Sequence, residues 1–264
     1  MSKNTTEQYI KIEWNYKPPS YFEEKLILER EGYSIGISEG SITAHMTANF
    51  FDSSQNMLDS LTMELHNYFL GAQVVRRQAF EISGGPITRR MPDGRKHTTI
   101  ALSTAVMKYS SWPVDLAYID SQGRAHDTRR DRIDIMKKLA DSSARYASTD
   151  QTLRKMLESF DAAVRDPGNE LVHLYEVWEA LSQKFQGESA VKDALGISNN
   201  ARSKLGRLAN DEPLNQGRHR GRYVGSLRDA TIEELGEARA IARDLIVSYS
   251  NYLDKENADG GIKV

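Results

Sequence analysis

Cysteine is absent from this chain of 264 residues. Its absence excludes disulfides, thiolate zinc sites, iron–sulfur clusters and a cysteine nucleophile, and it is typical of proteins in a reducing compartment. No apolar run reaches the length of about 18 residues that a membrane-spanning helix needs. Residues 1–14 lack the basic start and the apolar stretch of a secretory signal. We therefore expect a cytoplasmic protein that does not enter a membrane.

Familiar cofactor and metal motifs are also missing. The sequence contains no GxxxxGK[ST] loop, no GxGxxG and no HExxH, which are the patterns expected of phosphate, dinucleotide and zinc sites. Six histidines are present, but none stands at ligand spacing from another. We therefore predict no metal ion and no cofactor. The net charge of −2 also argues against a protein that coats nucleic acid along its whole surface.

The first half of the chain shows the alternation of half-buried strands. Polar and apolar side chains alternate in residues 9–16. One helix is predicted within this half, and it begins at Asp52 or Ser53 and ends at Gly71. Further strands are predicted at 22–30, 33–37, 41–46, 72–83, 97–109 and 114–120, with an irregular turn over 84–97. These elements predict an α+β fold, with an antiparallel β-rich domain over residues 1–125 that carries one helix.

The hydrophobic period changes to that of helices after residue 125. Asp127 is a candidate N-cap, and Thr231 with Glu234 forms a capping box at the last helix, which extends to Leu253. Other helices are predicted at 148–164, 170–185, 189–196 and 199–210. We therefore expect an all-α helical bundle domain over residues 126–256. The polar, glycine-rich residues 257–264 are expected to form a disordered tail.

Arg165 and His173 flank the helix break Asp166-Pro167-Gly168-Asn169. An arginine that binds phosphate and a histidine that moves protons suffice for metal-free RNA cleavage, in which the 2′-OH attacks its own phosphate. We therefore take Arg165 and His173 as candidate catalytic residues, with side chains turned towards a common notch. In the alternative interpretation, Asn169 and Glu170 cap the following helix while His173 packs against neighbours such as Val177.

Cationic residues are concentrated between Ala201 and Arg228, where seven stand against two acidic ones. Arginine binds phosphate bidentately, and a tyrosine can stack on a base. The candidate binding residues are Arg218, His219, Arg220, Arg222 and Tyr223, together with Arg202, Lys204 and Arg207. The alternative is that these guanidinium groups hold helix ends and pair with acids such as Glu170, Glu176 or Asp211.

Residues 188–209 also have the pattern of a helix-turn-helix unit, with a glycine corner at Gly196. In a DNA-binding regulator of this type, Asn199, Asn200, Arg202 and Ser203 would face the groove. Helix–glycine–helix corners are common in helical domains, so the pattern leaves a purely structural role open.

Four segments within residues 157–253 carry a resemblance: NELVHLYEVWEAL (169–181), LGIS (195–198), LANDEPLNQGRHRG (208–221) and LRDAT (227–231). This region resembles the C-terminal part of a group of uncharacterised bacterial proteins, and it is similar to the helical HEPN domains of toxin–antitoxin and phage-defence systems. HEPN enzymes are typically metal-independent RNases that use an R-x(4–6)-H motif across a homodimer interface. On this chain the motif falls on Arg165 and His173, which are separated by seven residues.

The resemblance implies an RNA-binding protein of a bacterial defence or toxin-type system, acting as a metal-independent endoribonuclease. Two alternatives stay open. The first is a non-catalytic binding or scaffold protein that holds a partner protein or an anionic nucleotide through the basic loop, which comprises residues 217–223. The second is the helix-turn-helix DNA regulator.

Overall fold

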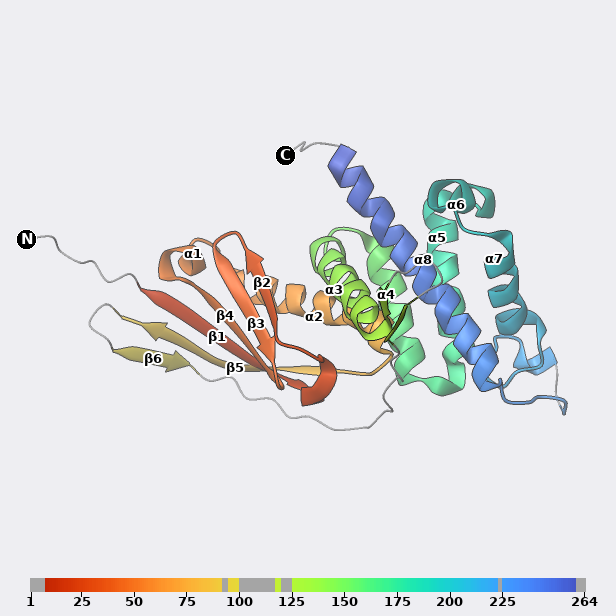
Figure 1. Cartoon of the computed structure of the whole chain (residues 1–264), viewed down its shortest axis with the longest axis horizontal. Coiled ribbons are helices and arrows are strands. Elements are labelled where there is room, and N and C mark those ends of the chain that lie inside the picture. Colours follow the sequence, from red (N-terminus) through yellow and green to blue (C-terminus); the bar gives the residue numbers. More distant parts are fainter. Residues whose placement is uncertain (1–7, 92–94, 100–116, 120–124, 223–224, 260–264) are drawn as a thin grey trace, which may run out of the picture. The chain divides into compact units, whose positions relative to one another are not determined.

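The computed structural model describes residues 8–91, 95–99, 117–119, 125–222 and 225–259 (Figure 1). The chain forms two compact units. The sheet unit comprises Met1–Thr62 and Phe80–Val114, and the helical unit comprises Met63–Ala79 and Asp115–Val264. The predicted α+β class is confirmed at this level, because an antiparallel sheet is followed by a helical region.

The sheet unit is built on six strands in the order β2-β3-β4-β1-β5-β6. Every neighbouring pair is antiparallel. The strands are β1 (Tyr9–Lys17), β2 (Leu26–Arg30), β3 (Tyr33–Ser38), β4 (Ser41–Thr47), β5 (Glu81–Arg90) and β6 (Lys96–Thr99). The predicted antiparallel strands β2, β3 and β4 follow one another in the sheet, and β1 lies between β4 and β5.

Strict alternation along β1 buries one face of this sheet. Ile10, Ile12, Trp14 and Tyr16 are each at most 3% exposed, while the residues between them lie on the opposite face. Ile12 is paired with Ala44 of β4. Two short helical elements complete the unit: a 3-10 turn at Pro19–Tyr21, and α1 (Ala48–Asp52), which the Thr47 side chain caps at the Phe50 amide.

The irregular turn predicted over 84–97 is wrong for residues 84–90, because these residues continue β5. The β1–β5 register shifts between Ile12 and Trp14, so that β5 contains a bulge opposite Glu13. A Cβ atom on Gly85 would lie 2.7 Å from the Glu13 carbonyl oxygen. Glycine and proline suggest a turn in the sequence, but here they fit a bulge. Glycine permits the close approach of the neighbouring backbone, and proline can stand where a bulge needs no amide donor.

The helix expected to end at Gly71 continues to Arg76, as α2 (Met57–Arg76). The strand predicted from residue 72 is therefore wrong over its first part. A Cβ atom on Gly71 would lie 2.7 Å from the Ala140 Cα and 2.5 Å from the Ser143 Oγ. Glycine serves here to let two helices cross closely, not to stop one. From Met63 onward this helix belongs to the helical unit, although we expected it in the first domain.

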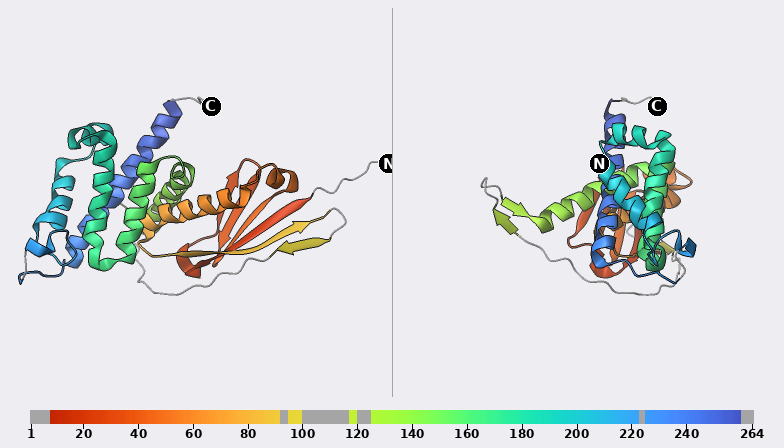
Figure 2. Two further views of the ribbon diagram at one scale, coloured as in Figure 1. Left: turned by 180° about the vertical axis from the view of Figure 1, so that it is seen from behind. Right: turned by 90° about the vertical axis from the view of Figure 1, so that its right-hand side faces the viewer.

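The helical unit contains α3 (Thr128–Tyr146), α4 (Gln151–Arg165), α5 (Glu170–Phe185), α6 (Glu188–Leu195), α7 (Asn199–Gly206) and α8 (Ile232–Asp259). Shorter elements are strands β7 (Ala117–Ile119) and β8 (Ala125–Asp127), 3-10 turns η2 (Pro167–Asn169) and η4 (Arg220–Arg222), and the π-helical η3 (Arg207–Asp211). Helix α8 lies against α3, α4, α5, α6 and α7 (Figures 1 and 2). It is six residues longer than predicted, and residues 260–264 of the expected tail lie outside the described residues.

Local capping accounts for the helix starts that the sequence predicts. The Asp127 carboxylate accepts hydrogen bonds from the amides of Arg129 and Arg130. Thr231 and Glu234 form the predicted reciprocal capping box, because the Glu234 amide donates to the Thr231 hydroxyl at 3.2 Å and the Thr231 amide donates to the Glu234 carboxylate at 2.8 Å. The helix predicted at 170–185 is confirmed as α5.

Asp150 connects three helices of the helical unit. Its Oδ1 accepts from the Leu153 amide at 2.7 Å and so caps α4, while its Oδ2 accepts from the buried Tyr249 hydroxyl of α8 at 3.0 Å. Lys184 of α5 lies 3.8 Å from the same carboxylate. Together with the buried apolar faces of these helices, this residue holds α4 in a defined position beside α5.

In the part of the chain that the structure describes, no helix is both long enough and apolar enough to cross a membrane.

Candidate functional site: the α4–α5 groove and its supports

Arg165 and His173 lie on opposite sides of the short break between α4 and α5. Arg165 is the last residue of α4, and its Nε donates at 2.8 Å to Asp161 one turn earlier on the same helix. Hydrogen bonding along the break then runs from the Asn169 side-chain amide to the Asp166 carboxylate at 2.7 Å. The Arg165 guanidinium therefore has a carboxylate partner on its own helix. In the expected notch, His173 contacts other residues than Arg165.

His173 is in the first turn of α5, and carboxylates lie at both of its ring nitrogens. Its Nδ1 is 3.3 Å from the Glu176 carboxylate, and its Nε2 is 3.6 Å from that of Asp166. The hydrogen bond from Asn169 is the main cause that lowers the pKa of Asp166. Desolvation acts in the opposite direction, and the interactions with His173 lower the pKa of Asp166 further. Asp166 therefore stays ionised beside the imidazole ring.

The alternative interpretation, in which Asn169 and Glu170 cap α5, is wrong in its details. The Asn169 side chain makes no capping hydrogen bond to α5; its amide binds Asp166, and its oxygen accepts from Arg220. Glu170 is 5% exposed and forms a bidentate pair with Arg239 of α8, in which the Nη2–Oε2 distance is 2.7 Å. Both residues connect α5 to more distant parts of the helical unit.

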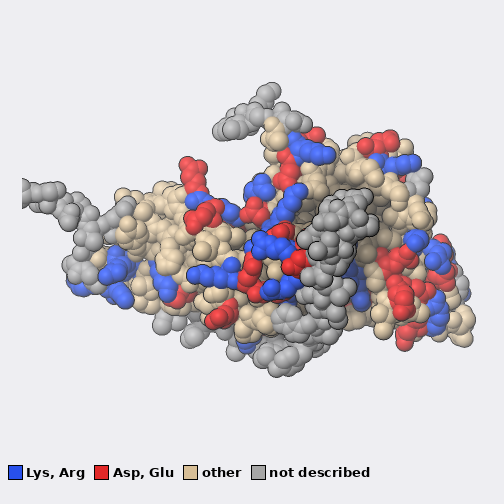
Figure 3. Space-filling view, viewed as in Figure 1, with Lys and Arg blue, Asp and Glu red and all other residues tan. Residues whose placement is uncertain are grey.

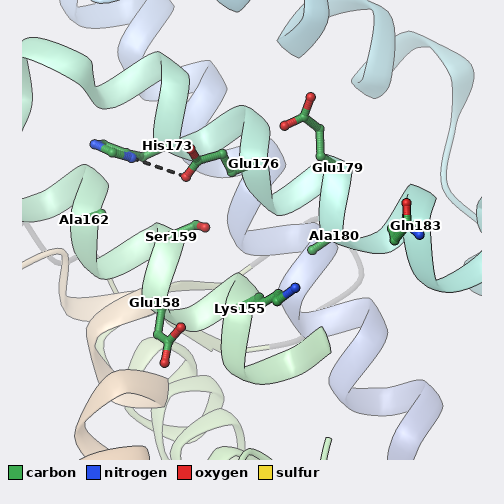
Figure 4. Close-up of a pocket in the computed structure, with 9 residues that line it drawn as sticks. All are labelled: Lys155, Glu158, Ser159, Ala162, His173, Glu176, Glu179, Ala180 and Gln183. Atoms are coloured by element: carbon green, nitrogen blue, oxygen red, sulfur yellow. Dashed lines mark hydrogen bonds and ion pairs between the residues drawn. The ribbon is translucent and has the colours of Figure 1, made fainter. Parts of the chain in front are cut away.

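A groove of about 490 Å³ runs between α4 and α5 and includes His173 (Figure 4). It is lined by Lys155, Glu158, Ser159 and Ala162 of α4, and by His173, Glu176, Glu179, Ala180 and Gln183 of α5. Figure 4 shows the His173–Glu176 pair facing Ser159 and Ala162 across the groove. Two alanines keep the groove open, and three glutamates against one lysine make its charge negative.

The basic loop braces the wall of this groove. Arg218 donates from Nη1 to Glu179 at 2.7 Å, and its guanidinium lies 5.3 Å from the centre of the Tyr175 ring. Arg220 donates from Nε to the Gly217 carbonyl at 2.9 Å and from Nη2 to the Asn169 side chain. Two loop arginines thus hold the first half of α5, which carries both His173 and Glu176.

Four further cations of this region have acidic partners. Arg202 pairs with Glu188, Lys204 with Glu237, and Arg207 with Glu212 at 2.6 Å. Arg228 pairs with Glu234 at 2.7 Å, and this pairing is the main reason why the pKa of Glu234 falls to about 2. These partners are not the acids named from the sequence, which were Glu170, Glu176 and Asp211. The kind of interaction, a cation paired with an acid of the same chain, is nevertheless the one that the structural alternative predicts.

Arg222 differs from its neighbours. It is exposed, and among the described residues its side chain has no hydrogen-bond or ion-pair partner. His219 is half-buried in the same loop. Tyr223, the candidate for base stacking, lies outside the described residues. On the face drawn in Figure 3, cationic and acidic side chains alternate over the described part of the helical unit.

The two short helices of the helix-turn-helix prediction are present as α6 and α7, with Gly196 in the left-handed conformation between them. Arg202, a candidate DNA contact, is engaged with the carboxylate of Glu188, and the neighbouring Lys204 with that of Glu237. Among the described residues, no three His, Asp or Glu side chains gather as a metal site.

Sequence reasoning missed several residues that shape the groove or its supports. Glu158 and Lys155 stand one turn apart on α4, while Glu179 owes its importance to a partner 39 residues away. Nothing in the local pattern distinguishes these residues from solvated helix residues. Only the packing of α4, α5 and α8 brings their charges together.

No protein-family model matches this chain, and neither a curated protein nor a solved structure is significantly similar to it.

Proposed function

We propose that this chain is a non-catalytic binding protein whose helical unit holds a cationic segment of a partner protein in the α4–α5 groove. The observation that carries this proposal is the charge of the groove, in which three glutamates stand against one lysine. A negative groove attracts lysine and arginine side chains and repels a phosphate backbone. Arg218 neutralises Glu179, which leaves Glu158 and Glu176 to bind the partner.

The groove is supported as a preformed binding surface. Arg218 and Arg220 fix α5 from the basic loop, and Asp150 fixes α4 from α8. A surface held in place before binding loses less conformational entropy when its partner arrives. The basic loop then acts as a support of the site rather than as the site itself. The setting in a bacterial defence or toxin-type system comes from the resemblance to HEPN domains.

A metal-independent RNase is the second candidate, and one observation favours it. The residue that follows Arg165 places its carboxylate 3.6 Å from the His173 Nε2, so the two ends of the motif are linked through Asp166. A carboxylate in that position orients an imidazole that transfers protons. To bind phosphate, Arg165 would have to exchange Asp161 for the substrate.

Fluorescence anisotropy tests the proposal with a labelled helical peptide that carries lysine or arginine at every third or fourth position. We expect saturable binding that weakens with added salt. The double variant Glu158→Gln/Glu176→Gln should lose about tenfold in affinity, since each exposed ion pair contributes roughly 0.2–1 kcal/mol. Glu233→Gln is the matched control, because Glu233 is an exposed acid on α8 away from the groove. Equal affinity of the double variant and the wild type would refute the proposal.

An RNase assay in EDTA separates the two candidates. If the chain were a HEPN-type enzyme, His173→Ala would reduce cleavage of single-stranded RNA by about 100-fold or more, the usual effect of removing a general acid or base. The binding proposal expects no cleavage that depends on His173. A large loss of cleavage in this variant would establish the RNase and overturn the non-catalytic assignment.

A further inference from the structure

The solvent-facing side of the sheet unit carries a row of side chains that crosses three strands. Tyr9 of β1 is paired with Arg90 of β5, and Arg90 is paired with Lys96 of β6. Paired residues project from the same face of a sheet, and successive residues alternate, so this face is opposite to the buried Ile10. Neighbouring strands lie about 4.8 Å apart, which places the backbone of Arg90 about 5 Å and that of Lys96 about 10 Å from Tyr9. We call these three residues the tyrosine row.

The side chains of the tyrosine row are open to solvent. Tyr9 is 50% exposed, although the aromatic residue Trp14 of the same strand is 3% exposed on the opposite face. Arg90 and Lys96 are exposed as well. For these two cations, the described residues supply neither an ion pair nor a side-chain hydrogen bond. Arg89, which projects from the other face, differs because it pairs with Asp52.

Negative charge is scarce around the tyrosine row. Residues 88–97 contain four arginine or lysine residues and one acidic residue. In the next row of the same face, Lys11 is paired in register with Thr88, and its ammonium group lies 2.7 Å from the Glu13 carboxylate. Lys and Arg side chains gather at the end of the sheet unit that carries β5 and β6 (Figure 3). This end of the sheet therefore attracts a polyanion.

We propose that the tyrosine row binds a single-stranded nucleic acid. An exposed aromatic ring stacks on an unpaired base, and cations beside the ring bind the phosphates of the same strand. A duplex keeps its bases stacked on one another, and an acidic protein surface has no base to offer to the ring. Only the single strand therefore uses both the Tyr9 ring and the two cations. The row lies in the sheet unit, and it does not depend on the function proposed for the helical unit.

Fluorescence anisotropy of the full chain tests this surface with labelled oligothymidine DNA and oligouridine RNA, each about 12 nucleotides long. We expect saturable binding, since base rings and phosphates are common to both strands. Tyr9→Ala should reduce the affinity about tenfold or more, because one stacked base is lost. Tyr9→Phe keeps the ring and should bind as the wild type does.

The two cations should be visible in the salt dependence of binding. On single strands, the logarithm of the affinity falls with the logarithm of the salt concentration by about 0.7 for each phosphate contact. Arg90→Gln and Lys96→Gln should each weaken binding and reduce this slope by about 0.7, whereas Tyr9→Ala should leave the slope unchanged. Lys25→Gln is the matched control, because Lys25 is an exposed lysine beside β2, the strand at the opposite edge of the sheet. Its affinity and slope should equal those of the wild type.

A duplex of the same length and a polyglutamate peptide represent the other polyanions, and both should bind more weakly than the single strands. Circular dichroism checks that each variant is folded, and Arg90→Gln and Lys96→Gln decide the matter if Tyr9→Ala is not. The proposal is overturned if neither oligonucleotide saturates the wild type, or if the duplex or polyglutamate binds as tightly as the single strands. It is also overturned if the folded variants of the tyrosine row bind as well as Lys25→Gln does.

Discussion

Replacing Arg218 and Arg220 by glutamine tests whether the basic loop is an internal clamp. Arg218 loses an ion pair whose side chains are 34% and 46% exposed, a contact of roughly 0.2–1 kcal/mol. It also loses the Tyr175 ring at 5.3 Å, for about 0.5–1 kcal/mol. Arg220 loses two part-buried hydrogen bonds, at about 1 kcal/mol each. The double variant should therefore be destabilised by about 2–4 kcal/mol.

Urea unfolding followed by circular dichroism measures this loss in the helical unit. With a urea dependence of about 1–3 kcal/mol per M for a domain of this size, the midpoint should fall by about 1 M or more. Arg222→Gln is the control, because it removes a positive charge from the same loop without removing a contact among the described residues. Its midpoint should stay at the wild-type value. If the double variant unfolds at the same urea concentration as Arg222→Gln, the clamp interpretation is refuted.

Two further changes test the helix crossing and the capping box. Gly71→Ala should destabilise the protein by about 1–3 kcal/mol in urea unfolding, because the added Cβ meets the backbone of α3. Gly236→Ala in α8 is the control: nothing lies within 4 Å of the added Cβ, so this variant should be stabilised by up to about 1 kcal/mol. Equal effects of the two changes would contradict the close crossing. Arg228 and the Thr231 amide lower the pKa of Glu234 from 4.5 to about 2, so this carboxylate stabilises the fold above pH 4.5 and loses that effect as the pH falls towards 2. Glu234→Gln should therefore be less stable than the wild type at pH 7, and the difference should disappear near pH 2; a difference that persists unchanged there would show that the charge is not responsible.

The helical half of the fold follows closely from local sequence. Asp127, the Thr231–Glu234 box and the break before Glu170 each act within a few residues, and the structure begins its helices at these positions. Capping and amphipathic periodicity are local effects that a sequence displays directly. The alternation of β1 is of the same kind, because it depends only on which face of the strand is buried.

Glycine was misleading at two positions for a single physical reason. Gly71 and Gly85 look like terminators of a helix and a strand, but each lies where another part of the chain approaches the backbone closely. The same missing Cβ permits a turn or permits a close approach. Which of the two applies depends on a neighbour that is distant in sequence.

The candidate site shows the same division between local and distant causes. The sequence identified Arg165, His173 and the cationic loop, because residue type and spacing are visible in it. It did not determine that Arg165 pairs with Asp161, that carboxylates flank His173, or that Arg218 reaches Glu179 across 39 residues.

Sequence alone thus determined the class of the fold, most of its helices and the residues that carry charge near the site. The tertiary structure decided the partner of each charge near the site, and with it the negative sign of the groove. The physical reason is the range of the forces involved. Caps and periodicity act over one or two helical turns, whereas an ion pair requires only that two side chains be close in space, wherever they stand in the chain.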